Sequence, residues 1–406
     1  MNTDFKNGKE LLEFCEKEKI SISRAMLLRE SDQTEKTESS IYTRMETAWN
    51  IMKEAALSPI SSPGKSIGGL IGGEAKQLNQ LFKAEKNICG TAVSRGITYA
   101  MAVLEVNASM GLIVAAPTAG SSGIVPGVVL SLKEEHDFSD SQAVDALFNA
   151  GAIGYLAMRN ATVAGAVGGC QAEVGVASAM AASAAVELMG GSPRQCLYAA
   201  STVLMNMLGL VCDPVGGLVE YPCQMRNASG VANAMIAAEL ALAGIPQLIP
   251  FDEMLEAMYT VGKKLPGELR ETAMGGCAVT PTGCQYGCKR TLFLKNQISP
   301  SLLQIQTNLL QRDLPSVRER QRSPWTGSSF LPFRQPFHRS LRSFSHPAKN
   351  QVRETRGQTE RCCRICLSLS SSRPASSSSS SIFPSVSLSV SLISPSKPLR
   401  AAKGEN

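Results

Sequence analysis

Hydrophobic residues recur at helical spacing through the first 288 residues of the chain, and the alternation typical of β-strands is nearly absent. Residues 38–57, for example, place Ile41 and Trp49 on one helical face, and Pro59 is expected to end this helix. The longest apolar runs are rich in alanine and glycine, which indicates helices that pack closely on several sides. The pattern therefore predicts a mostly helical protein.

Start and stop signals divide this part of the chain into further helices. Ser139, with Gln142 three residues later, has the spacing of a capping box, and Ser192-Pro193 opens another helix with proline at its first position. The other predicted helices are two short ones in residues 1–30, a buried Ala-rich one at 172–189, one at 229–243, and one at 253–264 capped by Asp252. The predicted fold class is all-α, with Ala/Gly-rich packed helices joined by Gly/Pro-rich loops.

Composition divides the chain into two parts. Residues 1–288 hold 31 of the 34 glycines and carry a net charge of −8, whereas residues 289–406 carry +14 and include a poly-Ser run at 376–381. The second part has low complexity and high positive charge, so it is not expected to bury a core. We predict a helical domain at 1–288 and a basic, Ser/Arg-rich, disordered extension at 289–406. A basic tail is able to bind nucleic acid, but this one lacks a fold to aim its charges, and no nucleic-acid partner is predicted.

Cysteine use and the N-terminal sequence bear on the compartment. Twelve cysteines in 406 residues do not form the dense disulfide framework of a small secreted protein. The N-terminus lacks the apolar core of a signal peptide, so a cytoplasmic location is expected. The most apolar runs carry polar groups such as Gln171 and Glu173, which a lipid-facing helix would avoid, so no membrane span is predicted.

Three cysteines lie on turns built from glycine and proline. Cys212 and Cys223 bracket C-D-P-V-G-G-L-V-E-Y-P-C, and Cys170 lies upstream in G-G-C-Q-A-E-V-G. Such turns let thiolates converge with backbone N–H groups near them, as an iron–sulfur cluster requires, and three thiolates on four irons leave one iron open as a Lewis acid. Cysteine also serves as a small hydrophobic residue in Ala/Gly-rich packing, and that alternative stays open. Zinc is disfavoured because no C-x-x-C pair or histidine is near.

Five segments, in order, resemble the alpha chain of the iron–sulfur-dependent L-serine dehydratases (L-serine ammonia-lyases). They are G-G-L-I-G-G-E-A-K (68–76), P-T-A-G-S-S-G-I-V-P-G (117–127), G-G-C-Q-A-E-V-G (168–175), C-D-P-V-G-G-L-V-E-Y-P-C-Q-M-R-N (212–227) and G-G-C-A-V-T-P-T-G (275–283). The resemblance covers residues 16 to about 284. It implies an all-helical catalytic domain that binds a [4Fe-4S] cluster through Cys170, Cys212 and Cys223 and leaves the fourth iron for the substrate.

The resemblance also implies a reaction and a partner. L-serine would be dehydrated and deaminated to pyruvate and ammonia, as part of amino-acid degradation and gluconeogenesis. In two-subunit members a separate beta chain completes the active-site cleft, so a beta chain is the expected partner. The chain departs from the family after P-T-G, where over 110 further residues resemble nothing in it. Any role of a free C-terminus near the active site is therefore in doubt.

Candidate substrate-binding residues come from two loops. Thr118, Ser121 and Ser122 offer hydroxyls beside backbone N–H groups that suit a carboxylate, although a plain helix-breaking turn would carry the same residues. Lys76 is either a substrate-side charge or a surface lysine. In some relatives a cysteine at the end of the chain caps the open iron, and Cys284 lies about where that cysteine would be. No residue is identified as the catalytic base.

Two rival interpretations stay open. A pyridoxal-phosphate dehydratase would catalyse the same net reaction, but the lysine context for its Schiff base is missing. The chain could also be a truncated or non-catalytic alpha-like subunit that pairs with a beta chain without a working cluster. The unusual extension motivates this second alternative.

Overall fold

The computed structural model describes residues 3–287, and in this part of the chain the regular elements are helices. The predicted all-α fold is thereby confirmed. One isolated β-bridge, between Cys212 and Arg270, also occurs there. The predicted extension at 289–406 lies outside the described residues, so its disorder and the domain boundary at 288 stay predictions.

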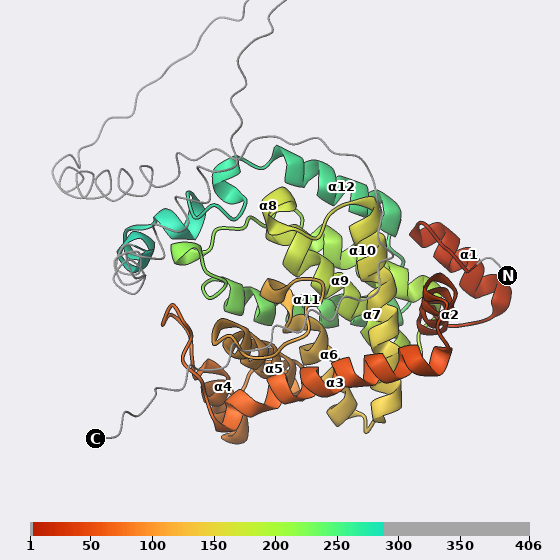
Figure 1. Ribbon diagram of the computed structural model, residues 1–406, viewed down its shortest axis with the longest axis horizontal. Coiled ribbons are helices and arrows are strands. Elements are labelled where there is room, and N and C mark those ends of the chain that lie inside the picture. Colours follow the sequence, from red (N-terminus) through yellow and green to blue (C-terminus); the bar gives the residue numbers. More distant parts are fainter. Residues whose placement is uncertain (1–2, 288–406) are drawn as a thin grey trace, which may run out of the picture. The chain divides into compact units, whose positions relative to one another are not determined.

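Figure 1 shows the α-helices along the described part of the chain. They are α1 (Gly8–Glu18), α2 (Ile22–Thr34), α3 (Glu38–Ser61), α4 (Glu74–Lys83), α5 (Gly90–Ala108), α6 (Ile124–Glu135), α7 (Asp140–Asn160), α8 (Gly165–Gly168), α9 (Val176–Leu188), α10 (Pro193–Asn206), α11 (Cys223–Leu242) and α12 (Phe251–Lys264). Within residues 3–287, none of these helices combines the length and the apolar character needed to cross a membrane.

Helix α9 forms the centre of the helical packing. It contacts α6, α7, α10 and α11 (Figure 1), and nearly all of its residues are buried. Because most of them are alanine or serine, neighbouring helices approach closely: a Cβ atom at Gly230 of α11 would lie 2.6 Å from Ser178 Oγ. The Ser178 hydroxyl donates to a backbone carbonyl one turn earlier, which satisfies this buried polar group. The buried helix expected at 172–189 is confirmed, with its first turn, Gln171–Gly175, wound as a π-helix.

Two predicted helix starts are confirmed in detail. Ser139 and Ser192 each accept a hydrogen bond from the backbone N–H three residues later. The Gln142 and Gln195 side chains accept the N–H of Ser139 and Ser192 in return, at 2.9 Å each. These are complete capping boxes, so local sequence alone decides where α7 and α10 begin.

Two predicted boundaries are wrong. α3 continues through Pro59 to Ser61, because the proline lies buried in the last turn, where the ring interrupts little of the hydrogen-bond ladder. α11 begins at Cys223 rather than at residue 229. Cys223 is therefore the first residue of a helix and not only the end of a loop.

The predicted cap of α12 is also wrong. Asp252 lies inside the first turn of α12. Its carboxylate accepts hydrogen bonds from Gly8 N at 2.7 Å and Lys9 N at 3.0 Å, so it caps α1 instead. A carboxylate at a helix N-terminus is stabilising for either helix, and tertiary packing decides which of the two it serves.

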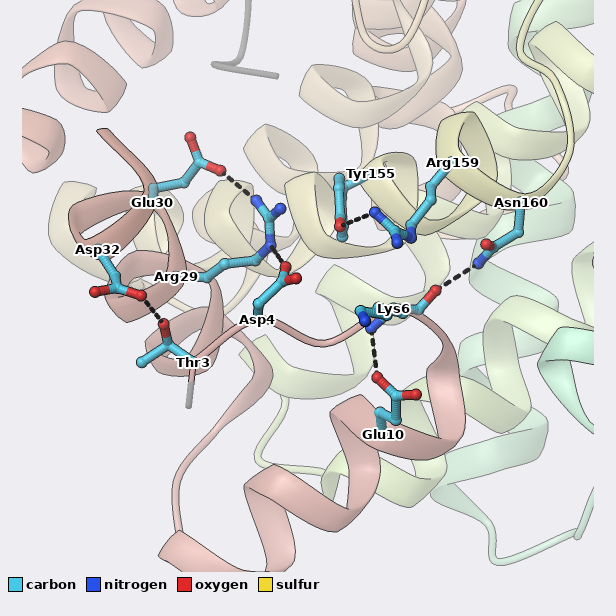
Figure 2. Close-up of polar contacts among 10 residues, drawn as sticks. All are labelled: Thr3, Asp4, Lys6, Glu10, Arg29, Glu30, Asp32, Tyr155, Arg159 and Asn160. Atoms are coloured by element: carbon cyan, nitrogen blue, oxygen red, sulfur yellow. Dashed lines mark hydrogen bonds and ion pairs between the residues drawn. The ribbon is translucent and has the colours of Figure 1, made fainter. Parts of the chain in front are cut away.

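A buried arginine fixes the N-terminal segment onto α2 and α7. Arg29 donates from Nε to Asp4 Oδ1 at 3.2 Å and from Nη1 to Glu30 Oε1 at 2.9 Å (Figure 2). Its guanidinium carbon lies 3.8 Å from the ring centroid of Tyr155 and 5.8 Å from that of Phe5. Burial raises the pKa of Glu30, and the charge of Arg29 offsets only part of that rise. We call these five residues the Arg29 clamp.

Candidate metal centre

Cys170 lies on a tight turn between two helices. Gly169 precedes it at φ +75°, a left-handed conformation, and a Cβ atom there would lie 2.8 Å from Leu210 O. Gln171 N donates to Leu210 O at 3.0 Å, and the Gln171 side chain accepts the N–H of Gly209 at 2.8 Å. These bonds hold the Cys170 turn beside the segment that leads to Cys212.

Cys212 is held by the β-bridge. Its N–H donates to Leu269 O at 2.9 Å, and its carbonyl accepts from Glu271 N at 2.7 Å. Gly165 leaves room for the thiol, since a Cβ atom at that position would lie 3.3 Å from Cys212 Sγ and 2.5 Å from Glu173 Oε2. The missing side chain at Gly165 thus lets the thiol and the carboxylate meet.

The structure brings two of the three predicted cysteines, Cys170 and Cys212, into one buried group with Glu173. The ligand atoms of Cys170, Glu173 and Cys212 all lie within 4.8 Å of one another. Cys170 and Cys212 are 2% exposed and Cys223 is 7% exposed. Burial, and then the charges of Cys170 and Glu173, raise the pKa of the Cys223 thiol to about 12, so Cys223 lies within electrostatic reach of both. We call these four residues the thiol site.

Groups of the thiol site favour their uncharged forms as long as no metal neutralises them. The pKa of the Cys212 thiol is raised far above its usual range, first by its hydrogen bond with Cys170, then by burial and neighbouring charges. Burial, and then the charge of Glu271, raise the pKa of Glu173 to about 7, and a hydrogen bond from Thr118 offsets part of that rise. Metal binding reverses this preference, because a thiolate–metal bond replaces the thiol proton.

Arg226 brings a positive charge to the thiol site. From Nη1 it donates to Cys170 Sγ at 3.5 Å and to Val211 O at 2.9 Å, and its Nη2 lies 2.7 Å from Asp213 Oδ1. Asp213 is 2% exposed, and its second oxygen accepts from Cys277 N at 2.6 Å. Burial alone would lower the pKa of Arg226, but the neighbouring Cys170 and Asp213 outweigh burial and raise it.

The loop at 117–123 lies against the thiol site. Thr118 hydrogen-bonds to Glu173, and a Cβ atom at Gly120 would lie 3.7 Å from Glu173 Oε1. Asn227 of α11 clamps this loop, because its side chain donates to Gly120 O at 2.8 Å and accepts the N–H at the end of the loop at 3.1 Å. The loop is thus positioned by the same helix that begins at Cys223.

The candidate substrate-binding residues differ in their surroundings. Ser121 and Ser122 are fully buried. Ser121 Oγ lies 3.0 Å from Thr118 Oγ1, and Ser122 Oγ donates to Ala119 O at 2.8 Å, so both hydroxyls help to close the turn. Lys76 is exposed on α4. Substrate binding by Thr118, Ser121, Ser122 and Lys76 stays a prediction.

Glu220 ties the glycine-rich loop at 66–73 to the loop between Cys212 and Cys223. Its carboxylate is 1% exposed and accepts three hydrogen bonds from that loop: from Ser66 Oγ at 2.8 Å, Gly68 N at 2.6 Å and Leu70 N at 3.0 Å. A Cβ atom at Gly68 would lie 2.5 Å from Glu220 Oε1, so this close approach requires glycine.

The segment at 275–287 lies beside the same loops. Besides the bond from Cys277 N to Asp213, Cys284 N donates to Thr280 O at 2.8 Å, and Cys284 Sγ lies 3.8 Å from Ala278 O. A cavity of about 470 Å³ opens here, lined by residues of three motif segments, among them Leu70, Tyr221 and Cys277. The role of Cys284 as a cap of the open iron stays a prediction.

Sequence reasoning identified the three cysteines but missed the charged residues around them. Glu173, Asp213 and Arg226 all lie inside motifs that carry the resemblance. A usable signal existed for Glu173, because it is a charged residue in an otherwise apolar run. Asp213 and Arg226 adjoin the cysteines in sequence, but their mutual pairing becomes visible only in three dimensions.

The donor set fits an iron–sulfur cluster. Thiolate sulfur is the usual ligand of such clusters. The thiols of Cys170 and Cys212 meet in a buried place, and the charge of Cys170 also acts on the buried thiol of Cys223. The Arg226 guanidinium already donates to one of these sulfurs, as the hydrogen bonds that tune cluster ligands do. The glycine at residue 165 leaves space where a side chain would fill the site.

Known proteins are similar in sequence to this chain over most of the described residues. The sequence model of the serine dehydratase alpha chain family matches residues 17–278. Over 279 residues the chain is 48% identical to the "Probable L-serine dehydratase, alpha chain" of Bacillus subtilis (strain 168), covering 69% of this chain and 93% of that protein. It is 43% identical over 276 residues to the L-serine dehydratase alpha chain of Peptoniphilus asaccharolyticus, covering 68% and 94%. It is 36% identical over 283 residues to L-serine dehydratase TdcG of Escherichia coli (strain K12), covering 68% and 62%.

Proposed function

The chain belongs to the serine dehydratase alpha chain family, and we propose that it deaminates L-serine to pyruvate and ammonia with a [4Fe-4S] cluster held by Cys170, Cys212 and Cys223. The observation that supports this proposal is the close approach of the buried Cys170 and Cys212 thiols, with the buried Cys223 thiol as the proposed third ligand. The names of the relatives support the substrate, and the thiols support the cofactor. A zinc site is less favoured, because no histidine joins these groups among the described residues.

Each protein group has a defined task in this proposal. When bound, the cluster supplies a Lewis-acidic iron that polarises the bond between Cβ and the hydroxyl of serine. Cys170, Cys212 and Cys223 would hold it. The backbone N–H groups and hydroxyls of the 117–123 loop bind the substrate carboxylate, with Thr118 the member that contacts Glu173.

We assign proton transfer to Glu173. Its buried carboxyl group lies 3.8 Å from Cys212 Sγ and faces the 117–123 loop, so it is an acid–base group beside the place proposed for the substrate. In the proposed reaction it takes the Cα proton of serine while the Cβ–oxygen bond breaks, and the departing hydroxide takes up this proton and leaves as water. The aminoacrylate that results tautomerises to an imine, and water hydrolyses this imine to pyruvate and ammonia.

We also propose that a beta chain completes the active site in the cytoplasm. The chain spans 93% and 94% of two relatives named alpha chain, but only 62% of TdcG, which carries the same matched region in a longer chain. The cavity of about 470 Å³ beside Cys277 gives such a partner a place to close over the substrate.

The test is anaerobic co-expression of the chain with a serine dehydratase beta chain. Iron and sulfide are measured together with pyruvate and ammonia formed from L-serine. The proposal expects about four irons per alpha chain, the content of one [4Fe-4S] cluster, and serine-dependent pyruvate. Bound cluster without pyruvate would favour a non-catalytic alpha-like subunit. Pyruvate formation without iron would refute the cofactor and point to a different dehydratase chemistry.

A further inference from the structure

Arg226 has no task in the reaction proposed above, yet it contacts the thiol site directly. Its side chain is 16% exposed and its carboxylate partner Asp213 is 3% exposed. Burying a guanidinium costs free energy unless its charge and its donors are matched. The partners it has are one carboxylate, one backbone carbonyl and the sulfur of Cys170.

The charge balance around the thiol site explains why a cation belongs there. Three thiolates bound to metal, together with Glu173 and Asp213, would gather negative charge in a poorly hydrated place. Opposite charges in contact stabilise such a group most where water is excluded. Arg226 sits between two of these groups, because one Nη faces Cys170 Sγ and the other faces Asp213 Oδ1.

The contacts of Arg226 also fix the direction of the Cys170 sulfur. The bond from Nη1 to Val211 O ties the guanidinium to the residue that precedes Cys212. Asp213 follows Cys212, and its second oxygen is held by Cys277 N. Arg226 thus connects the turn that carries Cys170 with both backbone neighbours of Cys212, through a planar fork that a lysine cannot reproduce.

We infer that Arg226 is a positioning residue that sets the Cys170 sulfur for metal binding and balances the negative charge of the loaded site. This inference rests on the proposed iron–sulfur function. Hydrogen bonds and charges next to ligand sulfurs tune both the retention of a metal and its reduction potential. The motif C-Q-M-R-N begins α11, and in this inference its arginine also supports the cluster through Cys170.

The test compares three substitutions at Arg226 with one at another buried arginine. Arg226→Met removes charge and donors, Arg226→Gln keeps donors without the charge, and Arg226→Lys keeps a charged donor without the planar fork. Arg29→Met is the control, because Arg29 also forms ion pairs away from water, with a side chain 8% exposed against 16% for Arg226, but lies in the Arg29 clamp instead. Each protein is reconstituted anaerobically with iron and sulfide, and iron is then removed with a chelator while the absorbance of the cluster is followed.

The inference expects iron loss from Arg226→Met to be about 10- to 100-fold faster than from the wild type, the usual cost of losing an outer partner of a metal ligand. The rates of iron loss from Arg226→Lys and Arg226→Gln should lie between those of the wild type and Arg226→Met. The reduction potential of the cluster should become more negative in Arg226→Met and Arg226→Gln and stay closer to the wild-type value in Arg226→Lys, because a nearby positive charge favours the reduced cluster. Arg29→Met should lower the melting temperature without changing either readout.

The outcomes separate this inference from the proposed function. If the wild type holds iron, and all Arg226 variants lose it at the wild-type rate with an unchanged potential, Arg226 is only structural and the inference is overturned. If Arg226→Met does not fold, the rates of iron loss and the reduction potentials of Arg226→Lys and Arg226→Gln are compared with those of the wild type. Values equal to the wild type would again overturn the inference. A wild type that binds no iron after reconstitution overturns the inference together with the proposed cluster.

Discussion

Two buried arginines of this chain stand in contrasting surroundings. Arg29 meets two carboxylates, Asp4 and Glu30, and lies 3.8 Å from the ring centroid of Tyr155 (Figure 2). Arg226 meets one carboxylate, Asp213, and donates its remaining contacts to a carbonyl and to a cysteine sulfur. The partners of Arg29 are carboxylates and an aromatic ring that lie outside the thiol site. The second shares its charge with atoms suited to bind a metal.

Because of this difference, we expect Arg29 to contribute to the stability of the fold and Arg226 to metal binding. Every partner of the Arg29 clamp belongs to α2, α7 or the N-terminal segment, so its loss should loosen the fold without touching the thiol site. The partners of Arg226 include a proposed metal ligand, so its loss should change metal retention more than folding. Both arginines form ion pairs in poorly hydrated places, and the chemistry of their other acceptor atoms makes the difference.

The largest expected effect is at the sulfurs themselves. Cys212→Ala should abolish stoichiometric iron after anaerobic reconstitution, as should Cys170→Ala and Cys223→Ala, because a cluster held by three thiolates loses a necessary ligand. Cys196→Ala, another buried cysteine, and Cys89→Ala, an exposed one, should keep the wild-type iron content. Iron and sulfide per folded protein are the measurement. Full iron content in Cys212→Ala would remove that residue from the ligand set.

The next effect concerns the Arg29 clamp. Arg29→Met should destabilise the protein by about 3 kcal/mol, because it leaves Asp4 and the buried Glu30 carboxylate without their cation. Denaturant unfolding of the metal-free protein measures this loss. Iron per folded protein should stay at the wild-type level. A large loss of iron with little loss of stability would contradict the separation drawn above.

A smaller effect is expected at neighbouring glycines of the 66–73 loop. Gly68→Ala should destabilise the protein by about 2 kcal/mol, since its new methyl group would displace the buried Glu220 carboxylate from its donors. Gly69→Ala meets no atom within 4 Å and suffers only from its φ of +70°, for about 1 kcal/mol. Chemical unfolding of both variants checks the order, and equal losses would show that the contact with Glu220 does not matter.

The smallest expected effect is a pH dependence in the Arg29 clamp. Burial raises the pKa of Glu30 in the folded protein, so the folded state binds a proton there more tightly than the unfolded state does. The associated stability is present below the unfolded pKa and is lost as pH rises through the folded pKa. Glu30→Gln removes this titration, so wild-type stability should fall relative to that variant as pH rises from mildly acidic to neutral. Parallel curves of stability against pH for the wild type and Glu30→Gln would refute this pH dependence.

The sequence predicted the local features of this fold and indicated the cysteines of the thiol site. Capping boxes at Ser139 and Ser192 and the buried run at 172–189 depend on neighbours in sequence, and they were read correctly. Asp252 was assigned to the wrong helix, because its partners at α1 lie 244 residues away in sequence. Such pairings depend on how helices pack, which periodicity does not reveal.

The same reason explains what was missed at the candidate site. Cysteines stand out in a sequence by their chemistry, whereas Arg226 gains its meaning from Cys170, 56 residues away, and from the orientation of Asp213. Glu220 likewise appears as an ordinary charged residue until three donors from the 66–73 loop surround it. The sequence indicates residue types that can bind a metal, whereas the residues that position them are identified only from the fold.

The central claim is that three thiolates hold a four-iron cluster whose last iron is left for the substrate. Mössbauer spectroscopy of the chain, reconstituted anaerobically with ⁵⁷Fe in the presence of a beta chain, tests it most directly. The account predicts that L-serine changes the signal of about a quarter of the iron and leaves the other three quarters unchanged, because three irons are already bound by cysteine. A spectrum that L-serine does not alter, or one that changes equally at all irons, would contradict it.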